Sequence, residues 1–253
     1  MTGREVAFNQ DIKALVVADG ILPLYLQYYL MANRSRLLKL VDSAGHGTGR
    51  LNTDLLKRFS VVVPSIKAQA NIAHILSTWD LAIERAERLI RAKERQFSWL
   101  LNGLVNQNNF GGEWQRVKLG EIAEIKTGDK DNQNKISDGE YPFFVRSQKV
   151  ERIDTFSFDG EAILIPGEGK IGEVIHYING KFDYHQRVHK ISDFSEFVLA
   201  RFLFYYLKCH FPKHAATHAV KATADSLRLP SFTAMDIAFP HLALQQKIVP
   251  TLS

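Results

Sequence analysis

The chain has 253 residues, 45% of them hydrophobic, and a formal net charge of +5. This length and composition suffice for one or two domains with a buried core, and the basic balance favours a polyanionic partner. The single cysteine, Cys209, excludes an intrachain disulfide, and neither a signal peptide nor an apolar run of about 18 residues occurs, so we expect a cytoplasmic protein without membrane contact.

Residues 1–65 open the chain with an apolar strand, a helix around Tyr28, a polar loop and a short strand that ends at Pro64. The same order recurs at the C-terminal end of the chain, displaced by 176 or 177 residues. The matched pairs include Gln10 with Gln186, Tyr28 with Tyr205, Pro64 with Pro240, and Gln69 with Gln245. We therefore predict that residues 1–65 are the rear half of a domain whose complete copy lies at 114–253.

Residues 66–105 are predicted to form one long helix, with Ser65 as its N-cap, followed by a linker at 106–113. Apolar residues recur along it at alternating spacings of four and three, which is the seam of a coiled coil, and a helix of this length spans roughly 57 Å. An ordinary core helix is the alternative to a spacer that packs against another helix. The predicted helix-packing residues are Ile72, Leu76, Trp79, Ile83, Ala86, Ile90, Phe97, Leu100 and Leu104, with Lys93 as the one polar member.

Residues 114–253 are predicted to form an α+β domain with mixed and antiparallel strands and helices. Short apolar runs at 116–125, 141–145, 162–166 and 173–178 are separated by Gly, Asp and Asn turns, which is typical of strands. The half domain at 1–65 cannot easily close a sheet of its own. We therefore expect a partial chain, or one that depends on another chain to cover an exposed edge.

Two motifs suggest small-ligand or metal sites. Gly167, Gly169 and Gly172 match the spacing of the dinucleotide fingerprint, but the following residues resemble a strand, whereas the fingerprint requires a helix. We therefore expect a tight turn between strands.

The histidines give the second alternative, a metal site. His185 and His189 are expected on one strand face, and three more recur every four residues, although Pro212 argues against a regular helix through them. The recurring three are His210, His214 and His218. No supporting carboxylate or cysteine spacing accompanies them, and no nucleophile elbow, P-loop or paired-carboxylate pattern occurs, so we predict no catalytic residue, no metal and no cofactor.

Basic and polar residues on predicted loops favour contacts with nucleic acid, because Arg and Lys neutralise phosphates while Arg, Thr and Ser can read base edges. Singly, each of these residues is more often a solvated surface group. The predicted DNA-binding residues are Lys126, Thr127, Lys130, Lys135, Arg146, Ser147, Lys149, Arg152, Lys170, Arg187, His218, Lys221 and Thr223, with His46, Thr48 and Arg50 in the half domain.

Several stretches, in this order, resemble the specificity subunit of type I restriction-modification systems. They are 114–123 (WQRVKLGEIA), 125–128 (IKTG), 165–172 (IPGEGKIG), 184–188 (YHQRV), 226–230 (SLRLP) and 239–248 (FPHLALQQKI), the last with a counterpart that begins at Val63 and Pro64.

The resemblance implies two target-recognition domains separated by long helices that pack antiparallel. It implies a non-catalytic protein that selects a split site on double-stranded DNA and docks modification (methyltransferase) subunits, to which restriction (nuclease-translocase) subunits add. This chain lacks the front half of the first domain and the second long helix of that arrangement. The apolar seam is therefore expected to be buried in a helix pair, either by self-association of this chain or with the missing helix. The alternative is a helical scaffold or interaction protein that does not bind DNA.

Overall fold

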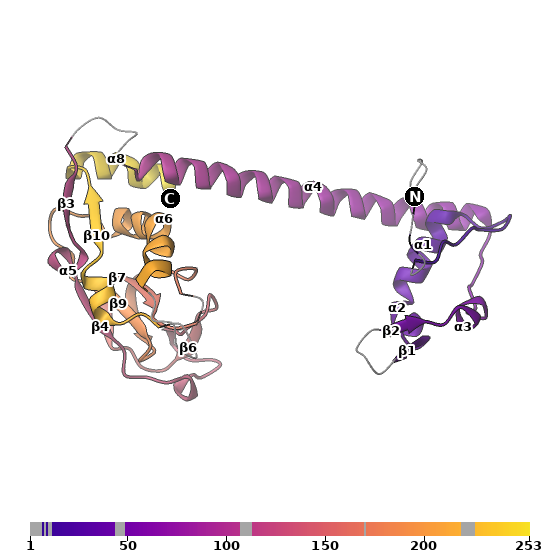
Figure 1. The fold of residues 1–253 in the computed structure, drawn as a ribbon, viewed down its shortest axis with the longest axis horizontal. Coiled ribbons are helices and arrows are strands. Elements are labelled where there is room, and N and C mark those ends of the chain that lie inside the picture. Colours follow the sequence, from indigo (N-terminus) through magenta and orange to yellow (C-terminus); the bar gives the residue numbers. More distant parts are fainter. Residues whose placement is uncertain are drawn as a thin grey trace. The chain divides into compact units, whose positions relative to one another are not determined.

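The structure is a computed structural model that describes residues 7, 9, 12–43, 49–106, 113–169, 171–218 and 226–253. It contains two compact units, Met1–Ala92 and Lys93–Ser253 (Figure 1). Helices accompany a mixed sheet in the second unit, so the predicted α+β class is confirmed. Within the described ranges, no helix is long and apolar enough to cross a lipid bilayer.

The first unit is mainly helical. Pro23 begins its first helix, where a missing backbone N–H costs nothing, and Asn52 caps a later one by accepting hydrogen bonds from two backbone N–H groups. Tyr25 and Tyr28 are buried, and their hydroxyls donate to the Val62 carbonyl at 2.7 Å and to Asp80 Oδ2 at 2.6 Å. The elements are α1 (Pro23–Ala32), α2 (Arg34–Leu38), the antiparallel strands β1 (Val41–Ser43) and β2 (Gly49–Leu51), and α3 (Thr53–Lys57).

The long helix predicted from the heptad pattern is confirmed as α4 (Ile66–Leu104). Ser65 Oγ accepts a hydrogen bond from the Ala68 backbone N–H at 3.3 Å, as expected of an N-cap. Phe97, Leu100 and Leu104 pack against the core of the second unit. Further towards the N-terminus the predicted packing residues are exposed, to between 39% and 66% for those with large side chains. These exposed residues are Ile72, Leu76, Trp79, Ile83, Ala86 and Ile90.

The second unit is built on a six-stranded sheet with the order β4-β9-β7-β8-β5-β6. Neighbouring strands are antiparallel except β5 and β8. The strands of this sheet are β4 (Glu124–Thr127), β5 (Tyr141–Phe144), β6 (Glu151–Ile153), β7 (Phe158–Pro166), β8 (His176–Tyr184) and β9 (Val188–Ser192). A separate antiparallel pair joins β3 (Gln115–Lys118) to β10 (Asp236–Phe239). The helices are α5 (Leu119–Ile122), the 3-10 turn η2 (Asn132–Asn134), α6 (Ala200–His218), α7 (Leu229–Thr233) and α8 (Leu242–Leu252).

The second half of β7 is buried on both faces of the sheet, to which its successive side chains point in turn. Ile163 and Ile165 share the main core with Phe202 and Leu203 of α6, which packs against β7 (Figure 1). Ala162 and Leu164 belong to a second cluster with aromatic residues of β5 and β8. The central strands therefore form a rigid base for the loops that follow them.

Several local expectations were wrong. The strand expected to end at Pro64 does not form, and residues 59–65 are in neither a helix nor a strand. The run 116–125 is not one strand, because Glu121 accepts a hydrogen bond from the Lys118 backbone N–H at 3.3 Å and one helical turn, α5, separates β3 from β4. The run 173–178 becomes a strand only at His176. His185 lies in the connection between β8 and β9, not on the strand that carries His189.

The helix α6 also differs from the expectation, since it continues through Pro212 to His218. Its buried side chains on both sides of the proline include Phe211 and Ala215, and the proline backbone packs closely on Gly172. Tertiary packing thus outweighs the hydrogen bond that a proline removes from a helix.

Candidate nucleic-acid interface

Two of the predicted DNA-binding arginines meet at one carboxylate. Arg146 follows β5, Arg187 lies between β8 and β9, and Glu168 follows β7. The guanidinium of Arg146 lies 3.4 Å from Glu168 Oε2, and that of Arg187 lies 3.2 Å from Glu168 Oε1. Three connections of the sheet therefore present one cluster of charge, which we call the arginine cluster.

The backbone beneath Arg187 is fixed at both of its polar groups. Its N–H donates to Nδ1 of His185 at 2.9 Å, and its carbonyl accepts from the Gly167 N–H at 2.9 Å. Because Nδ1 of His185 accepts this hydrogen bond, the proton of the neutral ring is on Nε2. The Nε2 atom lies 3.3 Å from Asp131 Oδ1. Burial lowers the pKa of His185, so the ring is neutral at pH 7 and positions Arg187 without adding charge.

Asp131 connects this cluster to the loop after β4. Its carboxylate accepts a hydrogen bond from the side-chain amide of Gln186 at 3.0 Å. It also accepts one from the backbone N–H of Asn132, and this bond is the main cause of the lowered pKa of Asp131. The Gln186 N–H also donates to the Lys130 carbonyl at 2.8 Å. The segments after β4 and β8 are thereby joined, although these strands are not neighbours in the sheet.

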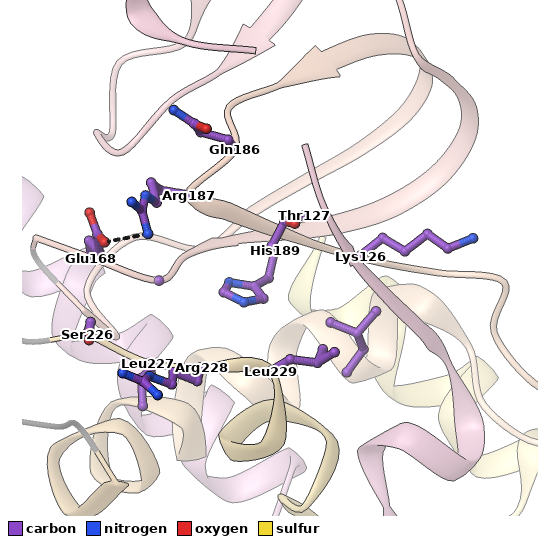
Figure 2. Close-up of a pocket in the computed structure, with 12 residues that line it drawn as sticks. Lys126, Thr127, Glu168, Gln186, Arg187, His189, Ser226, Leu227, Arg228 and Leu229 are labelled. Carbon is purple, nitrogen blue, oxygen red and sulfur yellow. Dashed lines mark ion pairs between the residues drawn. The ribbon is translucent and has the colours of Figure 1, made fainter. Parts of the chain in front are cut away.

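A cavity of about 660 Å³ lies beside Arg187. Figure 2 shows Arg187 and Glu168 pointing towards each other on one side, while the Lys126 side chain extends away from them. The cavity is lined by Ile125, Lys126, Thr127, Gly167, Glu168, Gln186, Arg187, His189, Ser226, Leu227, Arg228 and Leu229. Cationic and hydrogen-bonding groups share this lining with the apolar Ile125, Leu227 and Leu229. The polar groups suit an anionic, polar ligand such as DNA.

His189 is a structural residue in the wall of this cavity. It is 5% exposed, and its ring stacks on Phe232 with the centroids 4.1 Å apart. Burial lowers the pKa of His189 to about 4. A Cβ atom on Gly167 would lie 2.7 Å from His189 Cε1, so the glycine is required for the close approach of the loop to the ring.

The predicted lysines pair with nearby carboxylates. Lys126 Nζ lies 2.6 Å from Glu124, and Lys149 Nζ lies 3.1 Å from Glu151, which is also 3.8 Å from Lys135. Lys130 lies 3.7 Å from Asp129. All of these lysine side chains are at least partly exposed, so their charges are available to a phosphate.

The remaining predicted residues are distributed elsewhere or fall outside the description. The Arg152 guanidinium donates to the carbonyls of Gly139 and Glu140, so it holds a loop together. Ser147 Oγ donates to the Lys149 carbonyl, and His218 stacks on His214 at the end of α6. Lys170, Lys221, Thr223, His46 and Thr48 lie outside the described residues, as does the side chain of Arg50, whose backbone is part of β2.

Sequence reasoning missed the residues that organise the site. Glu168, Asp131 and His185 were not predicted to contribute, and neither were Gln186 and Arg228. Charge alone selects Lys and Arg, whereas a carboxylate that orients arginines is identified only by its neighbours in space. The available signal was that Glu168 comes two residues after the end of a buried strand, at the start of a glycine-rich turn.

The two alternative sites do not gain support from the geometry. After Gly172 the chain passes through a turn into β8, where a dinucleotide site needs the start of a helix. Among the described residues, no group of three or more His, Cys, Asp or Glu side chains is arranged to hold a metal ion.

Comparison with known proteins gives a family match over most of the chain and relatives that match more than half of it. Residues 1–94 and 111–253 match the family described as Type I restriction modification DNA specificity domain. The specificity subunit of the type I restriction enzyme EcoDI of Escherichia coli is 29% identical over 140 residues, which are 55% of this chain and 30% of that protein. The specificity subunit of the enzyme MpnII of Mycoplasma pneumoniae is 27% identical over 174 residues, or 64% of this chain and 52% of that protein.

A solved structure shares the fold. The S subunit of a type I restriction-modification system from M. genitalium superposes with a TM-score of 0.66 at 15% identity, over 92% of this chain and 66% of that one. This chain thus spans about a third to a half of the length of the two curated relatives, and about two thirds of the solved chain.

Proposed function

Because the chain belongs to the type I restriction-modification DNA specificity family, we propose that it recognises a DNA sequence and directs the other subunits of such a complex to it. The observation that carries the proposal is the family match over both 1–94 and 111–253, which includes each copy of the internal repeat. In this role the chain is non-catalytic and supplies binding and positioning only.

The second unit offers the DNA-binding surface. The arginine cluster, the adjoining cavity and the exposed Lys126 and Lys149 combine hydrogen-bond donors suited to base edges with charges suited to phosphates. Residues 114–253 are, in this proposal, a complete target-recognition domain, and residues 1–65 are the rear half of another. Residues 66–105 are the spacer between them, and 106–113 are a linker.

The exposed heptad face of α4 provides the protein–protein contact. Ile83 and Ile90 are more than half exposed on a helix whose apolar residues follow a coiled-coil spacing. We assign this face to packing against another long helix, with self-association as the form available to the chain alone. Modification subunits, and through them restriction subunits, are the further partners, and the cytoplasm, where the DNA is accessible, is the compartment.

The experiment that tests this function is selection from a pool of randomised DNA duplexes with the full chain at low salt. Enrichment of a defined sequence, with an affinity that falls linearly in a log–log plot against salt concentration, is the expected result. A helical scaffold without a DNA role would retain no duplex at any salt concentration.

A further inference from the structure

We propose that Glu168 determines sequence specificity by orienting Arg146 and Arg187 as readers of guanine edges, so that these arginines are not phosphate contacts. The inference rests on the proposed function, and it assigns different tasks to the cations of the same surface.

The geometry of the carboxylate supports an orienting role. Each oxygen of Glu168 serves one arginine, Oε2 at 3.4 Å and Oε1 at 3.2 Å. The Glu168 side chain is 25% exposed, whereas those of Arg146 and Arg187 are 42% and 58% exposed. The carboxylate is therefore the more sheltered partner, and the guanidinium groups keep N–H donors directed to solvent.

The loops that carry Glu168 and Arg187 are tied to each other. The Gly167 N–H donates to the Arg187 carbonyl at 2.9 Å, and the Gly167 carbonyl accepts from the Leu227 N–H at 2.8 Å. Arg187 is also held through its own N–H by His185. A guanidinium on a fixed backbone, with one terminal nitrogen beside a carboxylate, loses less conformational entropy when its other N–H groups form hydrogen bonds.

A phosphate is the wrong partner for this arrangement. The negative charge of Glu168 would repel a phosphate that approached either arginine, and it cancels one of their two positive charges. A guanine edge presents the neutral acceptors O6 and N7, which match the arginine fork without meeting that repulsion. Each carboxylate oxygen of Glu168 faces one guanidinium group, so the carboxylate is directed to the arginines.

The lysines of the same surface have the opposite character. Lys126 and Lys149 are 60% and 76% exposed, on flexible stems, and each pairs with a carboxylate of its own or the adjoining strand. A mobile point charge without a fixed fork suits a phosphate. The surface therefore contains two oriented donors for bases among movable charges for the backbone.

The test uses the full chain and the replacement Glu168→Gln, which keeps the size of the side chain and removes its charge. Duplexes selected by the unchanged chain are compared with scrambled duplexes, and their affinity ratio is the readout. We expect the ratio to fall about tenfold, with loss of preference at a guanine position, while affinity for scrambled DNA stays equal or rises. Glu151→Gln is the matched control, because it removes a carboxylate that pairs with lysines, and it should leave the ratio unchanged.

A second variant, Arg187→Lys, keeps the charge and removes the fork at an exposed position, so it tests the idea if Glu168→Gln fails to fold. The ratio should again fall, with the salt dependence unchanged. Ratios equal to that of the unchanged chain in every folded variant would overturn the inference while leaving the proposed function intact. Absence of any selected sequence with the unchanged chain would reject the proposed function, and the inference with it.

Discussion

Gln69 and Gln245 form equivalent sets of three hydrogen bonds in the two units of the chain. Both side chains are fully buried, and each lies near the start of a helix, Gln69 in α4 and Gln245 in α8. Each side chain joins its helix to the segment that precedes the first helix of the repeat, which is α1 in the first unit and α6 in the second. In each case Oε1 accepts a hydrogen bond from one backbone N–H, and Nε2 donates hydrogen bonds to two backbone carbonyls. The donor–acceptor distances are 2.8 or 2.9 Å. The partners of Gln69 are Leu22, Gly20 and Pro64, and those of Gln245 are Leu199, Phe197 and Pro240.

Replacing Gln245 by alanine should destabilise the second unit. The change leaves buried backbone groups of Leu199, Phe197 and Pro240 without partners, and we expect the free energy of unfolding to fall by about 2–4 kcal/mol. Urea denaturation followed by tryptophan fluorescence measures it. Gln246→Ala is the control, because Gln246 is exposed one position further along the same helix. Equal stabilities of the two variants would contradict the role assigned to the buried amide.

Repeats and periodicity could be predicted from the sequence because they depend on spacing along the chain alone. The heptad pattern from Ile72 to Leu104 requires only that one face of a helix be apolar, and α4 has the bounds that it implies. The alignment of Gln69 with Gln245 depends on the same kind of information. Neither depends on knowing which distant segments come into contact.

Elements whose formation depends on distant contacts were predicted less well. The proline in α6 is tolerated because Phe211, Ala215 and Gly172 pack around it, and no local pattern reveals that packing. The same applies to the site: Arg146 and Arg187 could be selected by charge, but their common partner Glu168 comes from a third loop. The pairing depends on the strand order, which the sequence did not provide.

The buried His189 should make the second unit less stable in mild acid. Its pKa is about 4 in the folded state, below the ordinary value of 6.5, so between these values the unfolded chain binds the extra proton. The contribution of His189 to the free energy of unfolding is complete above pH 7. Lowering the pH from 7 to 5 should reduce the free energy of unfolding by about 2 kcal/mol through this residue alone. Burial also lowers the pKa of His176, His185, His210 and His214, and these add to the effect in the same direction.

The variant His189→Phe isolates that contribution. A phenyl ring can stack on Phe232 but binds no proton, so the slope of unfolding free energy against pH should be smaller between pH 7 and pH 5. The slopes of the variant and the unchanged chain are compared, and not their free energies of unfolding, since the larger ring also changes the packing beside Gly167. His241→Phe alters an exposed histidine of the same unit and should leave the slope as it is. A slope unchanged in His189→Phe would mean that His189 takes up a proton without unfolding.

The exposed face of α4 should mediate association between helices. Ile83 and Ile90 are 54% and 57% exposed on the predicted seam, and aspartate at both positions would place two charges in a helix pair. Sedimentation velocity of the full chain should show a concentration-dependent larger species that the double variant lacks. Leu81→Asp is the control, because Leu81 is 53% exposed but lies off the seam, on the opposite side of the helix from Trp79 and Ile83. An unchanged chain that sediments as a monomer at all concentrations would exclude this contact.

Lys149 should contribute to DNA binding through charge alone. Its side chain is 76% exposed and shares Glu151 with Lys135, so no rigid geometry directs its ammonium group to a base. We expect Lys149→Ala to weaken binding by a similar factor for selected and scrambled duplexes, and to reduce the slope of log affinity against log salt by about 1. Lys247→Ala removes the same charge from the exposed side of α8 and is the control. A reduced slope in both variants would indicate a general effect of net charge, whereas a loss confined to the selected duplex would make Lys149 a base contact.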